Sequence, residues 1–407
     1  MEKIEKRNII CLWAIGMLRA AATAFLSVLP AYFLRSGMND MQISLYNTVA
    51  QLVSTSTSLL CAGVASGFRD SRKPLLMLLT IQSVFTGMYA LFCAFRVPAG
   101  SFYMIMLFIC GLLAIVSALT TIFDYKQPYE IMKIESYSVY VAYAGLFSGI
   151  IGAIVGVVLP MLFKKFDFYL ITGCSIVSAA LCLLISALLM YRLKLIGSAK
   201  ADDAVPSEKI AIHPLLDLKQ LAQNKDFLFL VMPNFLRGIG AGIVSMIALI
   251  AIRSIGMTDS DTPLLTTAGN IGSMLSSFLY VYFVKRFGVP KTGLIGGCIF
   301  CVICLAPFGG STLFLILYGA AYIGYIVLGN AIPNMVYECA DQTIISQFHT
   351  WRLAIMAMGT AVGTPICGIL LDKIPAALLL LLAAFAILLC MIGYYLCYYK
   401  RIKHVST

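Results

Sequence analysis

The stretch LRAAATAFLSVLPAYFLRS at residues 18–36 has a counterpart in LRGIGAGIVSMIALIAIRS at residues 236–254. The two stretches align without a gap, and each is apolar over most of its length. A long-range match of this kind predicts that the chain contains two copies of one structural unit. The identical pairs are Leu18 and Leu236, Arg19 and Arg237, Ser27 and Ser245, Arg35 and Arg253, and Ser36 and Ser254.

The match continues beyond these stretches. After a shift of one residue, GMND at 37–40 aligns with GMTD at 256–259, and Gln51 aligns with Asn270. The longest non-apolar segment of the chain follows the first copy and precedes the second. We therefore predict an N-terminal unit of residues 1–193, a cytoplasmic central loop of residues 194–225 and a C-terminal unit of residues 226–407.

The composition is that of an integral membrane protein. Of the 407 residues, 61% are apolar and 12% are charged, whereas a soluble globular domain carries roughly 25% charged residues. Apolar runs of about 20 residues, long enough to cross a hydrocarbon core roughly 30 Å thick, recur along the chain. We expect an all-α membrane protein with twelve transmembrane helices, six in each unit. The predicted spans are 9–34, 42–66, 74–95, 101–123, 138–163, 168–192, 227–252, 262–284, 292–309, 311–336, 350–371 and 375–398.

Basic residues are distributed unevenly between the two sets of loops. If the N-terminus is cytoplasmic, 20 of the 29 Lys and Arg residues lie on the cytoplasmic side, 6 on the outer side and 3 within spans. Because positively charged loops stay in the cytoplasm, this asymmetry predicts that both termini are cytoplasmic and that the protein lies in the cytoplasmic membrane. It also accounts for the net charge of +11 without any binding of nucleic acid.

Residue types that often form metal sites or catalytic groups are not arranged for either purpose. His213, His349 and His404 fall in loops or in the C-terminal tail. Most of the 13 cysteines lie within apolar spans, which is typical of small packing residues. We therefore predict no cofactor, no metal and no enzymatic activity.

Twelve spans, a repeat of six plus six and a long middle loop resemble the major facilitator superfamily over essentially the whole chain. The resemblance implies two pseudo-symmetric six-helix bundles, a substrate site at their interface near the membrane midplane, and alternating access. The loop GFRDSRKP at 67–74 keeps part of the family's short loop motif, and KRFGVPK at 285–291 keeps less of it. KRFGVPK departs from the motif because it has a lysine where the acid belongs.

Arg19 and Arg237 are the most informative charges in the sequence. Each is expected deep within the first span of its unit, where a charged guanidinium costs about 2.5–3.5 kcal/mol. None of the 18 Asp and Glu residues is expected well inside a span, so we expect neither arginine to have a counter-charge from the protein. The most economical partner is an anionic substrate, which a guanidinium binds through two parallel hydrogen bonds. Alternatively, either arginine lies in a water-filled cavity and bonds to backbone carbonyls.

Paired arginines on spans 1 and 7 also resemble the organophosphate:phosphate antiporters and related organic-anion carriers. Polar residues at a similar depth are candidates for the rest of the substrate site. Gln51 and Asn270 are equivalent in the two units, Asn47 lies one turn from Gln51, and Tyr325 belongs to a tyrosine stripe on the tenth span. Each of them can contact a substrate, but polar side chains also join helices within membranes.

Four residues are candidates for a cytoplasmic gate. By the family resemblance, Asp70 is expected near the start of the eleventh span, where it favours one state of the gate. Arg352 lies about one turn inside that span and is close in sequence to Glu338 and Asp341. We expect Arg352 to join an ion pair that forms only in the outward-open state.

Together these features favour a secondary transporter that moves a small organic or phosphorylated anion through the lipid bilayer. Since no acidic residue is expected within a span to carry protons, the sequence favours exchange, as in an antiporter, or facilitated flux over proton symport. We expect a monomer. Two alternatives stay open: an exporter of amphipathic drugs or metabolites, and a receptor that has a transporter fold but does not transport.

Overall fold

The computed structural model describes residues 3–61, 68, 70–98, 100–132, 134–195, 232–339 and 345–405, although not every side chain within them. Residues 196–231, which contain almost all of the predicted central loop, lie outside this part of the chain. The boundaries between the two units therefore stay a prediction.

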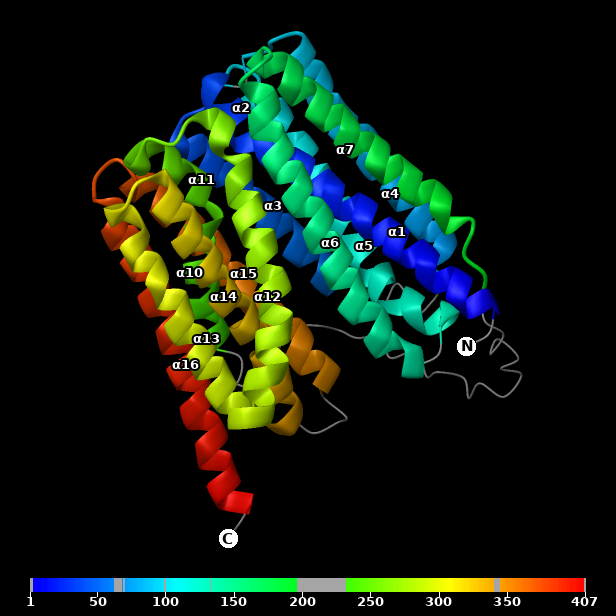
Figure 1. Ribbon diagram of the computed structural model, residues 1–407, viewed down its shortest axis with the longest axis vertical. Helices are drawn as coiled ribbons and strands as arrows, with labels where there is room; N and C mark the ends of the chain where they lie inside the picture. Colours follow the sequence, from blue (N-terminus) through cyan, green and yellow to red (C-terminus); the bar gives the residue numbers. More distant parts are fainter. Residues whose placement is uncertain are drawn as a thin grey trace.

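The described chain forms an all-α membrane protein, and a helix occupies the place of each predicted span (Figure 1). The N-terminal half contains α1 (Lys3–Phe25), which continues through η1 (Leu26–Val28) into α2 (Leu29–Arg35), then α3 (Asp40–Leu60), α4 (Arg72–Ala94), α5 (Tyr103–Ile131), α6 (Ile134–Phe163) and α7 (Phe168–Met190). The C-terminal half contains α10 (Pro233–Ser245), α11 (Ile247–Ile250), η3 (Ala251–Ile255), η4 (Asp259–Asp261), α12 (Pro263–Phe287), α13 (Val289–Phe300), η5 (Cys301–Phe308), α14 (Ser311–Cys339), α15 (Ile345–Leu370) and α16 (Ala376–Val405).

The repeated sequence forms the first helical column of each half, and both copies are interrupted at the same place. In the C-terminal half, α10 ends at Ser245, and the following segment Ile247–Ile255 is bent from it by 47°. The equivalent Ser27 lies in the short 3₁₀ turn η1 between α1 and α2. Ser27 donates a hydrogen bond to the carbonyl of Ala24 at 2.7 Å, and Ser245 donates one to Gly242 at 2.6 Å. Serine hydroxyls that bond to their own helix in this way compete with the backbone ladder and bend the helix.

Nine helices of the described chain are long and apolar enough to cross a membrane, and the bent column that begins with α10 makes a tenth. The helices at the places of the second and eighth predicted spans, α3 and α12, are 21 and 25 residues long but more polar. At a rise of about 1.5 Å per residue, both can still cross the hydrocarbon core. Their polar side chains are tolerated because much of their surface faces the other half of the protein.

The two halves contact each other through α12 against α6 and through α15 against α3. The halves meet at the end of the molecule where α3 and α12 begin, and their helices diverge towards the end that carries both chain termini (Figure 1). We call these the closed end and the termini end. Glycines allow the close approach, since a side chain at Gly156 would overlap Thr267 and one at Gly152 would overlap Asn270.

An ion pair also crosses between the halves at the closed end. The Nη2 atom of Arg253 lies 3.3 Å from the Oδ1 atom of Asp40. Asp40 is the first residue of α3 and is only 5% exposed. Asn39 caps the same helix by accepting a hydrogen bond from the backbone N–H of Gln42, whose side chain bonds back to Asn39. The carboxylate of Asp40 is therefore held at a fixed position that faces the other half.

Candidate functional site

Arg237 lies near the middle of α10 and is only 7% exposed. Its guanidinium carbon lies 5.1 Å from the ring centroid of Tyr325 on α14. One turn further along α14, Gly329 leaves room for the guanidinium, because a Cβ there would come within 2.9 Å of Nη2. The structure thus brings together two of the predicted substrate residues, the arginine and the tyrosine that stacks on it.

The Arg237 guanidinium makes no hydrogen bond and no ion pair within the described part of the chain. Its Nε atom is sealed from solvent, whereas its terminal nitrogens are not, so they account for the group's accessible surface. Arginine carries five N–H donors and remains charged, and a buried charge without a partner is strongly unfavourable. The contact with Tyr325 compensates for only part of this, since a cation–π contact contributes about 0.5–2 kcal/mol. Arg237 is therefore a buried cation without a hydrogen-bonded or charged partner among the described residues.

Arg19 differs, and the prediction that it has no counter-charge from the protein was wrong. Its role in substrate binding stays a prediction. The Nη1 atom of Arg19 lies 2.6 Å from the Oδ2 atom of Asp124, with the two side chains 33% and 26% exposed. Arg19 therefore has a counter-charge within the protein. The predicted fourth span ended at residue 123, which placed Asp124 at a helix end. In the structure α5 continues to Ile131, so the carboxylate lies about two turns before the end of the helix and reaches α1.

The other predicted substrate residues are divided between the two halves. Gln51 lines a cavity of about 320 Å³ within the N-terminal half. The Nδ2 atom of Asn47 lies 3.6 Å from the sulfur of Met246, which is a contact between the halves. Asn270 packs against Gly152 of α6, so its side chain also lies in the contact between the halves. The last two contacts fit the alternative in which amides join helices.

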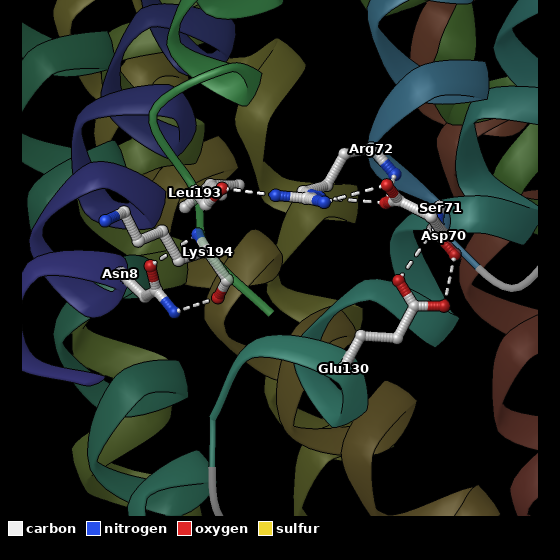
Figure 2. A network of polar contacts seen from close by, with 7 residues as sticks. All are labelled: Asn8, Asp70, Ser71, Arg72, Glu130, Leu193 and Lys194. Atoms are coloured by element: carbon white, nitrogen blue, oxygen red, sulfur yellow. Dashed lines mark hydrogen bonds and ion pairs between the residues drawn. The ribbon is translucent and has the colours of Figure 1, made fainter. Parts of the chain in front are cut away.

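Asp70 belongs to a polar network at the termini end of the N-terminal half (Figure 2). Arg72 donates hydrogen bonds of 2.8 Å to both carboxylate oxygens of Asp70 and one of 2.5 Å to the carbonyl of Leu193. These charge-assisted hydrogen bonds from Arg72 hold the pKa of Asp70 below its usual range. The network therefore connects the loop before α4 to the segment that follows α7.

Two further contacts extend the same network (Figure 2). Glu130 on α5 accepts hydrogen bonds of 2.9 Å from the backbone N–H and the hydroxyl of Ser71. Asn8 on α1 donates to the carbonyls of Ile131 and Lys194 and accepts a hydrogen bond from the backbone N–H of Lys194. The network thus links the ends of α1, α4 and α5 with the segment after α7, all within one half.

The remaining gate residues are only partly described. Arg352 is buried in α15, within electrostatic reach of Cys390 and Tyr394 on α16. Asp341 and the side chain of Glu338 lie outside the described residues. The gate roles of Asp70, Arg352, Glu338 and Asp341 therefore stay a prediction.

Sequence reasoning missed two features of these sites. One is Asp124, for the reason given above. The other is Gln82 on α4, which lines the same cavity as Gln51. Its signal was present, because Gln82 is the one carboxamide side chain within the predicted span 74–95. Among the described residues, no group of three His, Cys, Asp or Glu side chains could hold a metal ion.

No protein-family model and no curated protein matches the sequence. Solved structures match it over nearly its whole length. The nucleoside transporter NupG superimposes with a TM-score of 0.72 at 15% identity, covering 98% of this chain and 100% of that one. A bacterial homolog of the human lysosomal transporter Spinster, inward-facing and unoccupied, gives 0.64 at 16% identity, covering 99% and 98%.

FucP, a fucose:proton symporter of E. coli, has also been solved in an outward conformation as a major facilitator superfamily transporter. It superimposes with a TM-score of 0.64 at 15% identity, covering 96% of this chain and 98% of that one. Likeness at such low identity shows a shared architecture rather than a shared substrate. The chain has the fold of the major facilitator superfamily.

Proposed function

We propose that this protein is a secondary transporter that works by alternating access and carries a small organic anion. The charged group of the substrate binds Arg237, and Tyr325 forms the adjoining wall. Transport proceeds by exchange or by facilitated flux. The observation that carries the proposal is the Arg237 guanidinium, which is buried and has neither an ion pair nor a hydrogen bond within the described part of the chain.

The architecture supports the transport part of this proposal. The solved structures with the same fold are named as transporters of nucleosides and of fucose with protons, and as a homolog of a lysosomal transporter. The contacts between the halves lie at one end, and the helices diverge at the other (Figure 1). With both termini in the cytoplasm, as the basic loops favour, the present conformation opens towards the cytoplasm.

The anion part is tested by conservative and neutral substitutions of Arg237. In Arg237→Lys the charge remains, but the fork that forms two parallel hydrogen bonds is lost. Losing such a partner in a desolvated site costs about 2–5 kcal/mol, so we expect affinity for the anion to fall roughly 30-fold or more. Thermal-shift titration with phosphates, carboxylates, sulfonates and neutral compounds identifies a ligand, and the variant is then titrated with it.

The stability of the ligand-free protein distinguishes this role from a structural one. Arg237→Gln should not lower the melting temperature of the ligand-free protein, because it removes a buried charge that lacks a partner. A variant that melts earlier but binds the anion normally would show that Arg237 is structural. Such a result would end the proposal of an anion site at this residue.

The Arg19–Asp124 ion pair supports a second candidate, in which transport is coupled to protons. The preference for exchange or facilitated flux depended on the absence of an acid inside the helices, and Asp124 now supplies one on α5. In this version Asp124 accepts a proton and releases Arg19 during the cycle. A pH gradient across proteoliposomes should then drive accumulation by the wild type but not by Asp124→Asn. Accumulation that is independent of the gradient favours exchange or facilitated flux.

The orientation of the chain is tested separately from the substrate. Single cysteines in residues 199–210 of a cysteine-depleted variant should be shielded from impermeant reagents in intact cells and labelled after lysis, because this loop is predicted to be cytoplasmic. Cysteines placed in the 96–101 turn provide the matched positions on the opposite side. Labelling of the 199–210 loop from outside would reverse the assignment of the two ends.

A further inference from the structure

The cavity beside Gln51 lies within the N-terminal half, between the bend of the first helical column, α3, α4 and α5. Its volume is about 320 Å³, which lies at the lower end of the range for small-molecule sites. Gln51 and Ser54 face it from α3, and Gln82 faces it from α4. Leu26 and Leu29 close it on the side of the first column. None of the residues that line this cavity carries a charge.

The two glutamines carry the only carboxamide groups in the lining of this cavity. Gln51 is exposed and Gln82 is half-buried, and within the described part of the chain neither side chain has a hydrogen-bond partner. Threonine hydroxyls in the same two helices, by contrast, have partners. Thr80 donates to the carbonyl of Leu76, and Thr48 donates to the carbonyl of Ser44. A carboxamide carries two donors and two acceptor lone pairs. Each amide therefore remains available to an occupant of the cavity.

Hydrogen bonds fix another part of the cavity lining in place. The hydroxyls of Tyr46 and Tyr89 lie 2.8 Å apart, and the hydroxyl of Tyr89 also donates to the carbonyl of Met106 at 3.3 Å. The thiol of Cys110 donates to the carbonyl of Tyr46. These bonds connect α3, α4 and α5 around the cavity. Part of the cavity lining is thus held in place before a ligand binds, and such pre-organisation favours tight binding.

The cavity and Arg237 can be compared by their heights along the helix axes. Asn47 and Met246 are in contact between the halves. Gln51 lies four residues beyond Asn47 along α3, and Arg237 lies nine residues before Met246 along α10. Both displacements point towards the termini end, by about 6 Å and about 13 Å along the helix axes. The two heights therefore differ by about 7 Å. Because Arg237 contacts Tyr325 and Gly329 in the C-terminal half, a molecule that reaches both sites has to extend from one half to the other.

We infer that this cavity binds the uncharged part of the substrate, and that this part is a planar group presenting a donor and an acceptor side by side, as a cyclic amide does. A glutamine amide pairs with such an edge through two parallel hydrogen bonds, as it does with nucleobase edges. The absence of charged residues from the lining excludes a second ionic group, and Leu26 and Leu29 suit the face of a ring. The inference rests on the proposed transport function for its purpose, but binding at the cavity can be measured without transport.

Three related probes test the inference. Uracil is neutral and has the required amide edges, 1,3-dimethyluracil lacks both N–H donors, and orotate adds a carboxylate to the uracil ring. We expect uracil and orotate to bind the detergent-solubilised full-length protein in thermal-shift and calorimetric titrations. We expect 1,3-dimethyluracil to bind at least about tenfold more weakly, because hydrogen bonds to the glutamines are lost.

The variants Gln51→Leu and Gln82→Leu should each weaken uracil and orotate by about tenfold or more, and should not lower the melting temperature of the ligand-free protein, because unpartnered amides are removed. Thr80→Val is the matched control, since it removes a hydroxyl from α4 that does not line the cavity. Arg237→Gln should weaken the binding of orotate but leave the affinity for uracil unchanged. The proposed anion site and the proposed binding in the cavity can therefore be disproved independently of each other. The inference is overturned if uracil does not bind, if 1,3-dimethyluracil binds as well as uracil, or if both leucine variants retain wild-type affinity.

Discussion

Arg19 and Arg237 occupy equivalent positions in the repeat, but their side chains have different surroundings. Arg19 forms a partly exposed ion pair with Asp124, whereas Arg237 is buried under Tyr325 with no carboxylate nearby in the described chain. Removing one partner of an ion pair destabilises the fold, because the other charge is left without a partner. Removing a buried charge that has no partner does not have this cost. The two arginines should therefore respond in opposite ways to the same substitution.

For Arg19→Gln we expect a lower melting temperature of the ligand-free protein. The substitution leaves the Asp124 carboxylate without its cation in a partly buried place, at a loss of about 1–3 kcal/mol. Adding Asp124→Asn should recover most of the loss, since the double variant contains no unmatched charge. Arg237→Gln is the internal comparison and should not lower the melting temperature. If Arg19→Gln and Arg237→Gln change stability equally, the difference between the two sites is not electrostatic.

The sequence identifies Arg19 and Arg237 because a charge inside an apolar run is visible without a structure. It does not identify Asp124, because the end of an apolar run does not mark the end of a helix. Here α5 extends to Ile131, well beyond the hydrophobic segment. Gln82 is visible as an amide in an apolar helix, but whether it faces lipid, another helix or a cavity depends on how α4 packs against α3 and α5.

At the scale of helices, α6 and α12 approach each other closely because α6 presents glycines to its neighbour. At the closed end, a Cβ on Gly156 would overlap Thr267 Oγ1 and lie 2.8 Å from the carbonyl of Pro263. Small residues at such crossings let the backbones of membrane helices pack tightly. In the sequence, Gly145, Gly149, Gly152 and Gly156 have a spacing that places them on one face of the fifth span, but the sequence does not identify the helix that they contact. In the structure Gly149, Gly152 and Gly156 pack on α12, whereas a Cβ at Gly145 would meet nothing within 4 Å.

We expect Gly156→Val to separate α6 from α12 and to favour the conformation in which the closed end opens. The extra side chain cannot fit without moving Thr267 or the backbone of Pro263. A cysteine in place of Ala153, whose carbonyl accepts a hydrogen bond from Thr267, should then react faster with a maleimide in a cysteine-depleted protein. Gly145→Val on the same helix is the matched control and should leave the rate unchanged. Equal rates in the two variants would show that this crossing does not govern opening.

For the molecule as a whole, the internal repeat predicted an architecture of two similar units. One unit alone cannot bury its polar faces, so the two units are expected to pack against each other. The structure has two halves whose more polar helices, α3 and α12, lie between them. The sequence could not predict which end is closed, because the same contacts within each half serve both conformations. Nor could it predict that Asp40 pairs with Arg253, since the two residues lie in different halves and depend on the conformation for their proximity.

The Asp40–Arg253 ion pair should therefore set the balance between the two conformations. Asp40 is held at the start of α3 and is buried. Without Arg253, its carboxylate is buried and lacks a cation while the closed end stays closed, whereas water can solvate the carboxylate when that end opens. Arg253→Gln should disfavour this state by about 1–2 kcal/mol, a population shift of about 5- to 30-fold. Spin labels at Tyr191 and Phe287, at the termini end of the two halves, should then report a new population at shorter distance. Arg96→Gln is the matched control, because it removes the same charge at the same end but breaks an ion pair with Asp167 inside one half. It should leave the distances unchanged. Identical distance distributions in the two variants would show that the Asp40–Arg253 ion pair does not hold the halves together.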